Sequence, residues 1–148
     1  VVKQRDARLV ILGEGQLRET LLEQALQLGI ADKVAFPGFT DNPWAWMRRA
    51  AVFVLSSRWE GSPNTLTEAL ALGTPVVSTD CPSGPRELLN GGNIAPLVPM
   101  GDIAALSEAI LSTLSNPPEA AMLVNAVKDY HQDVSARRYL HALGLTIG

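Results

Sequence analysis

Short apolar runs that alternate with stretches of helical periodicity are the feature that most constrains the fold of this chain. Runs of this length, bounded by glycine or proline, are typical of strands buried in a sheet. Strands are therefore predicted at residues 8–13, 33–36, 52–55, 75–79 and 94–98. Helices are predicted at residues 16–28, 42–50, 63–72, 86–89, 102–114, 119–130 and 135–143. This alternation indicates an α/β fold, a Rossmann-like parallel sheet with helices on both faces.

Composition excludes several classes of function. Hydrophobic residues make up 47% of the 148 residues, which suits a globular domain with a core. The net charge of −3 argues against a nucleic-acid-binding surface. No apolar run approaches the roughly 18 residues of a membrane span. The single Cys81 excludes an intrachain disulfide and fits a reducing compartment, and with only two histidines no metal site is expected.

The start of the helix after the third strand has the pattern of an anion site. Ser62 fits an N-cap position, and Pro63 then fits the first helical position. The backbone N–H groups of Asn64, Thr65 and Leu66 would lack helical partners. Because the positive end of the helix dipole also lies there, the sequence predicts a phosphate site.

Two glutamates flank this helix start. Glu60 precedes the helix, and Glu68 lies one turn beyond Asn64, away from the apolar stripe of Leu66 and Leu70. Carboxylates repel phosphate but accept hydrogen bonds from sugar hydroxyls. The combination predicts a sugar on either side of a diphosphate.

The run EGSPNTLTEALALGTPVV, with seven residues between Glu60 and Glu68, resembles the E-x7-E signature of glycosyltransferase family 4. That family has the GT-B fold and a retaining mechanism. The segments RLVILGEGQLR, KVAFPGF, STDCPSGPRELL and LVPMGD resemble the family in the same order, so the resemblance covers roughly residues 5–143. It implies that this chain belongs to the C-terminal, donor-binding half of such an enzyme.

The resemblance also implies a role for each site residue. Glu68 would hold the ribose hydroxyls, and Glu60 would contact the transferred sugar as the catalytic residue. Backbone amides at the helix start would hold the diphosphate, and the glycines would let backbone approach it. No metal and no cofactor beyond the nucleoside-diphosphate sugar, with UDP as the expected nucleotide, is implied. The predicted donor-binding residues are Gly13, Gly15, Phe39, Glu60, Ser62, Asn64, Thr65, Leu66 and Glu68.

Parts of the family pattern are not matched. The family's donor domain begins with a further strand and helix that carry a basic pair, and an acceptor-binding domain precedes it. We therefore expect a cut before Val1 in a longer protein. Residues 1–148 would form one partial donor-binding domain with terminal helices at about 119–143, inactive alone.

The longer protein would transfer sugar to a glycan or lipid-linked acceptor, bound through the N-terminal domain, in bacterial surface polysaccharide assembly. It would act in the cytoplasm, with peripheral association at the inner face of the membrane left open. Without the family's first strand, the strands at 8–13 and 52–55 lack a shared neighbour. They would pair directly, or a second copy of the chain would fill the gap by self-association.

Other interpretations remain open at this point. The first alternative is a non-catalytic nucleotide- or sugar-binding module on the same fold, since fold does not determine function. Another is a different GT-B enzyme, such as an epimerase or a phosphorylase, against which the E-x7-E run argues. Trp44, Trp46 and Trp59 are interpreted as packing residues rather than as a sugar platform. Arg86 could contact phosphate or remain solvated.

Overall fold

The structure, a computed structural model, describes residues 1–145 of the chain. These residues form two compact units, the first from Val1 to Ala45 and the second from Trp46 onward. Each unit has its own parallel sheet.

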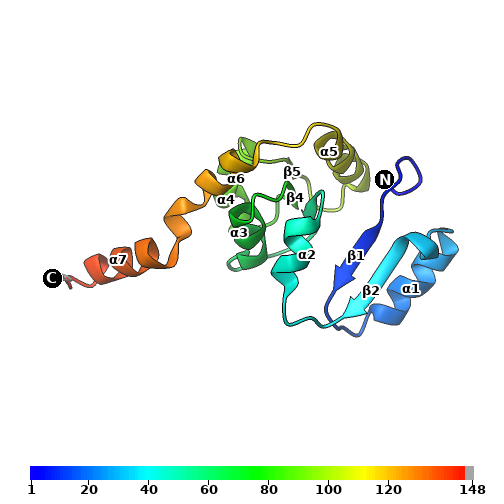
Figure 1. Cartoon of the computed structure of the whole chain (residues 1–148), viewed down its shortest axis with the longest axis horizontal. Helices are drawn as coiled ribbons and strands as arrows, with labels where there is room; N and C mark the ends of the chain where they lie inside the picture. The colour runs from blue at the N-terminus through cyan, green and yellow to red at the C-terminus, as the bar shows by residue number, and fades with distance from the viewer. Residues whose placement is uncertain (146–148) are drawn as a thin grey trace. The chain divides into compact units, whose positions relative to one another are not determined.

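The first unit is a β-α-β element (Figure 1). Its two strands are parallel neighbours, with Leu9 opposite Val34 and Leu12 opposite Gly38. The helix between these two strands must end in a turn before the chain can form the second strand. Gly29 forms this turn, with a φ of +64°. The elements are β1 (Leu9–Leu12), α1 (Arg18–Gln27), the 3-10 turn η1 (Ala31–Lys33) and β2 (Val34–Gly38).

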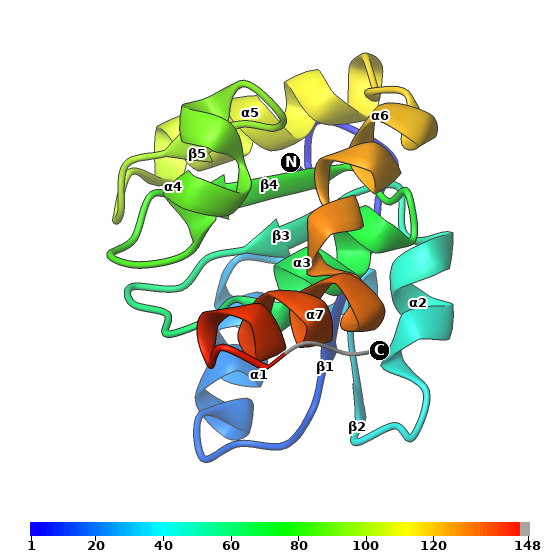
Figure 2. The same ribbon diagram turned by 90° about the vertical axis from the view of Figure 1, so that its left-hand side faces the viewer.

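The second unit has a three-stranded parallel sheet of order β3-β4-β5. Figure 2 shows α3 and α5 on opposite sides of this sheet. Helix α2 (Pro43–Arg49) spans the boundary between the units. The remaining elements are β3 (Phe53–Leu55), α3 (Asn64–Ala71), β4 (Val76–Thr79), α4 (Pro85–Leu88), η2 (Asn90–Gly92), β5 (Leu97–Val98), α5 (Ile103–Ser115), α6 (Ala120–Ala126), η3 (Lys128–Tyr130) and α7 (Gln132–Ala142).

The core of the second unit lies around α3. The α3 residues Leu66, Ala69 and Leu70 are fully buried and pack with residues of β4 and α4. Helix α6 completes this core with Leu123, which is also fully buried. The core therefore holds α3 against the sheet, and the start of α3 follows the carboxyl end of β3, the end at which ligands bind in such sheets.

The predicted fold class is confirmed, since every strand pair is parallel and all five strands occur in the expected order. Some boundaries differ. Strand β5 has two residues instead of the predicted five, and α7 begins at Gln132 instead of residue 135. The earlier start of α7 has a local cause, because the His131 side chain accepts a hydrogen bond from the Asp133 N–H.

Each of the two strands that lacked a shared neighbour is paired within its own unit, β1 with β2 and β3 with β4. The expected direct pairing or self-association stays a prediction. The expectation of one partial domain over residues 1–148 stays a prediction. No helix within the described residues is long and apolar enough to cross a membrane.

Candidate functional site

The loop between β3 and α3 carries Glu60 and is attached to β4 and to the loop that follows it. The Thr79 hydroxyl lies 2.5 Å from the Ser57 carbonyl oxygen and 3.3 Å from that of Leu55. The Glu60 N–H donates to the Pro82 carbonyl at 3.4 Å. These contacts tie the loop to the neighbouring strand, so its conformation does not depend on the loop sequence alone.

The Glu60 carboxylate has a side-chain partner in the same loop. The Ser57 hydroxyl donates to Oε1 of Glu60 at 2.6 Å, and both residues are half-buried. Within residues 1–145, the other carboxylate oxygen has no hydrogen bond and no ion pair. Since a carboxylate offers about four lone-pair positions, Glu60 keeps capacity to accept from a ligand hydroxyl.

The start of α3 differs from the predicted cap. Pro63, not Ser62, is the N-cap residue, and no side chain caps the helix. With φ −78° and ψ 68°, Pro63 forms an inverse γ-turn in which the Asn64 N–H donates to the Ser62 carbonyl at 2.8 Å. The proline ring sets this φ, which explains why the turn forms here.

The prediction of three unpartnered N–H groups is therefore wrong for two of them. The Asn64 amide is used in the γ-turn, and the Leu66 amide donates to the Pro63 carbonyl at 2.9 Å. The Leu66 side chain is fully buried in the core. Of the three, only the Thr65 N–H has no hydrogen bond within the described part of the chain, and Thr65 is exposed.

Glu68 lies one turn further along α3. Its side chain is half-buried, and within residues 1–145 it has neither an ion-pair partner nor a side-chain hydrogen bond. The core positions of α3 are Leu66, Ala69 and Leu70, so Glu68 points to another side of the helix, as predicted. The two glutamates thus differ, because the Glu60 carboxylate is hydrogen-bonded to the Ser57 hydroxyl and the Glu68 carboxylate has no side-chain partner within residues 1–145.

The predicted glycine positions lie in the first unit. The Gly13 N–H donates to the Gly38 carbonyl at 2.8 Å, which joins the loops after β1 and β2. Gly13 has a φ of +103°, a conformation that favours glycine. A Cβ on Gly15 would meet no atom within 4 Å, and Phe39 is 76% exposed. Gly13, Gly15 and Phe39 therefore lie in the loops that follow the carboxyl ends of β1 and β2.

The predicted site residues thus form two groups, each within its own unit. Glu60, Ser62, Asn64, Thr65, Leu66 and Glu68 surround the start of α3, and Gly13, Gly15 and Phe39 follow β1 and β2. Among residues 1–145, no cluster of three histidine, cysteine, aspartate or glutamate side chains could hold a metal ion.

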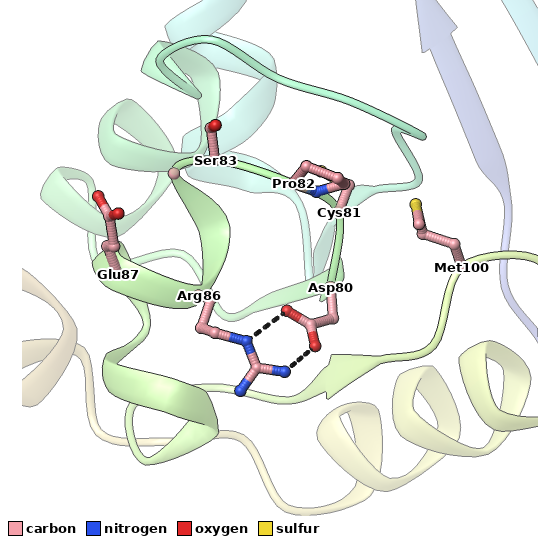
Figure 3. Close-up of a pocket in the computed structure, with 8 residues that line it drawn as sticks. Asp80, Cys81, Pro82, Ser83, Arg86, Glu87 and Met100 are labelled. Atoms are coloured by element: carbon pink, nitrogen blue, oxygen red, sulfur yellow. Dashed lines mark hydrogen bonds and ion pairs between the residues drawn. The ribbon is translucent and has the colours of Figure 1, made fainter.

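A hollow of about 300 Å³ lies beyond the ends of β4 and β5 (Figure 3). On one side of it the Arg86 guanidinium donates to both carboxylate oxygens of Asp80. Arg86 is thus paired with Asp80, while its side chain stays 66% exposed to solvent. The lining residues are Asp80, Cys81, Pro82, Ser83, Gly84, Arg86, Glu87 and Met100, and none of them is a predicted donor-binding residue.

The three tryptophans are more exposed than their interpretation as packing residues implies. Trp59 is 76% exposed beside Glu60, and Trp44 and Trp46 are about half exposed. The packing interpretation is wrong for Trp59. Its position in a loop after a strand, outside any apolar repeat, was a signal for exposure.

Sequence reasoning also missed Ser57, Thr79 and Gly84, which contact the loops and helix of the site. A Cβ on Gly84 would lie 2.4 Å from Cδ of Pro63, at the start of α3. Each of these contacts joins residues from different loops or strands, or depends on a loop conformation. Only the position of Ser57 three residues before Glu60 offered a local signal.

Comparison with known proteins places these features in context. The family model described as "Glycosyl transferases group 1" matches residues 1–130. A Campylobacter jejuni relative, N-acetylgalactosamine-N,N'-diacetylbacillosaminyl-diphospho-undecaprenol 4-alpha-N-acetylgalactosaminyltransferase, is 36% identical over 111 residues. That match covers 75% of this chain and 30% of the relative.

Solved structures agree with the fold. The apo form of the lipopolysaccharide outer core galactosyltransferase WaaB has a TM-score of 0.83 and 25% identity, covering 93% of this chain and 40% of that chain. Anabaena Alr3699/HepE in complex with UDP has a TM-score of 0.80 and 21% identity, and the match covers 93% of this chain and 41% of that chain. These similarities confirm the Rossmann-like fold expected for the C-terminal half of a GT-B glycosyltransferase. The matched part makes up only 12 to 30% of the length of the first curated relatives.

Proposed function

Because the chain belongs to the glycosyl transferases group 1 family, we propose that it binds the nucleoside-diphosphate sugar used by a retaining glycosyltransferase. We further propose UDP as the nucleotide. The observation that carries the proposal is the pair of half-buried glutamates at the start of α3, each with a carboxylate oxygen free to accept a hydrogen bond.

Each group at the start of α3 has a chemical task in this proposal. The Glu68 carboxylate accepts from the ribose hydroxyls, which are strong donors to a charged acceptor. The Thr65 N–H and the positive end of the α3 dipole bind the diphosphate. The Glu60 carboxylate accepts from a hydroxyl of the transferred sugar. That Gly13, Gly15 and Phe39 of the first unit also bind the donor stays a prediction, and the proposed site uses no metal.

The wider role is proposed from the relatives. The Campylobacter enzyme is named for an acceptor carried on diphospho-undecaprenol, and the HepE structure holds UDP. By analogy, the longer protein transfers sugar to a lipid-linked or glycan acceptor during assembly of a bacterial surface polysaccharide. We place this activity in the cytoplasm.

Titration of the ¹⁵N-labelled chain with UDP, followed by NMR, tests the binding site. We expect saturable and weak binding, with amide shifts concentrated in residues 62–68. The amides of α7, which has no buried residues, are the internal control and should not move. Saturation with shifts confined to other segments, or no binding at millimolar UDP, would contradict the assignment.

A further inference from the structure

The loop before α3 contains a hydroxyl that the E-x7-E pattern does not include. Ser57 lies three residues before Glu60, and its hydroxyl donates to Oε1 of Glu60 at 2.6 Å. This distance lies within the range of about 2.5–2.7 Å expected for a charge-assisted hydrogen bond between oxygen atoms. No other side chain within residues 1–145 forms a hydrogen bond or ion pair with the Glu60 carboxylate.

The backbone of Ser57 is itself held from β4. Thr79 is 5% exposed, and its hydroxyl lies 2.5 Å from the Ser57 carbonyl oxygen. Strand β4 is the central strand of the sheet, so it is a rigid support for the loop. The contacts therefore run from β4 through Thr79 to Ser57, and from Ser57 to the Glu60 carboxylate.

A glutamate side chain has three rotatable bonds, and a free one in a loop samples many orientations. A hydrogen bond to one carboxylate oxygen limits the rotation and leaves the second oxygen for a ligand. A hydroxyl also suits this task because it adds no charge that would compete with a bound sugar.

We propose that Ser57 is a positioning residue, whose hydroxyl orients Glu60 so that the free carboxylate oxygen accepts from a hydroxyl of the transferred sugar. The inference rests on the proposed function of Glu60. It goes further in assigning the discrimination between donor and free nucleotide to a pair, Ser57 and Glu60, rather than to Glu60 alone.

The test measures dissociation constants by calorimetry for UDP and for three donors, UDP-glucose, UDP-galactose and UDP-N-acetylgalactosamine. The quantity compared is the ratio of the Kd for the tightest donor to the Kd for UDP. Variants of the 148-residue chain are Ser57→Ala, Ser57→Thr, Glu60→Ala and the double variant Ser57→Ala/Glu60→Ala. Ser56→Ala is the matched control, because Ser56 is exposed in the same loop.

We expect Ser57→Ala to raise this ratio about tenfold, which corresponds to one charge-assisted hydrogen bond, while the Kd for UDP stays the same. Ser57→Thr keeps the hydroxyl and should restore most of the loss. In the Glu60→Ala background, Ser57→Ala should have no further effect, because Ser57 acts only through that carboxylate. Ser56→Ala should behave as the unmodified chain.

Two results separate failure of this inference from failure of the proposed function. If Glu60→Ala raises the ratio and Ser57→Ala does not, or if their effects add in the double variant, the positioning role is wrong and the proposed function stands. If Glu60→Ala leaves the ratio unchanged, or if the unmodified chain binds UDP but none of the donors, both are contradicted.

Discussion

A Cβ on Gly84 would lie 2.4 Å from Cδ of Pro63, so the loop after β4 packs against the residue that starts α3 without room for a side chain. Gly84 also has a φ of +88°, a conformation that side-chain-bearing residues rarely adopt. The start of the predicted phosphate-binding helix is therefore positioned partly by a glycine that lies twenty-one residues further along the chain.

Replacing Gly84 should consequently destabilise the second unit. We expect Gly84→Ala to lower the free energy of unfolding by about 2–4 kcal/mol, from backbone strain together with overpacking against Pro63. Urea unfolding followed by circular dichroism measures this. Gly61→Ala is the matched control, since its Cβ would meet no atom within 4 Å and its φ is not positive. Equal stability of the two variants would contradict the packing account.

The order of strands and helices could be predicted from the sequence because it depends on local patterns. Apolar runs and helical spacing can be recognised in the local sequence without knowledge of tertiary contacts, so all five strands were identified. The parallel pairing followed from the alternation of strands with helices. The shortness of β5 was not predicted, because pairing length depends on how far a neighbouring strand extends.

The positions of the two glutamates beside the start of α3 were predictable from the sequence, but the contacts around them were less so. The spacing of Glu60 and Glu68 identified two carboxylates at the start of α3. The γ-turn at Pro63 was missed, because a proline after Ser62 fits both a first helical position and a turn. The support of Ser57 by Thr79 joins a loop to a strand, and no local pattern indicates which hydroxyl will lie opposite which carbonyl.

Leu66 should behave as a core residue, although it was predicted among the donor-binding residues. Its side chain is fully buried, and its amide is bonded to Pro63. We expect Leu66→Ala to lower the free energy of unfolding by about 2–5 kcal/mol through loss of buried apolar contacts. Leu143→Ala is the control, because Leu143 is 72% exposed and its replacement should change stability by less than about 0.5 kcal/mol. An unfolding curve for Leu66→Ala that matches this control would show that the core assignment is wrong.

Thr79 should contribute to stability through its hydroxyl. Valine has nearly the same shape but cannot donate to the carbonyls of Leu55 and Ser57. We expect Thr79→Val to lower the free energy of unfolding by about 1–3 kcal/mol, since buried carbonyls lose a partner. Thr79→Ser keeps the donor and should lose less, even though it removes a methyl group. Thermal unfolding of both variants decides the matter, and a larger loss for Thr79→Ser would count against the hydrogen-bond account.

The central claim is that Glu68 binds the ribose of the donor and Glu60 binds its transferred sugar. Calorimetry of Glu68→Ala and Glu60→Ala with UDP and with the tightest UDP-sugar tests it most directly, with the exposed Glu108→Ala as control. Glu68→Ala should weaken both ligands by roughly ten- to hundredfold, the loss of about 1.5–3 kcal/mol. Glu60→Ala should weaken the UDP-sugar by a similar factor and leave UDP unchanged. Equal weakening of UDP by Glu60→Ala and Glu68→Ala, or no effect of either variant, would contradict the account.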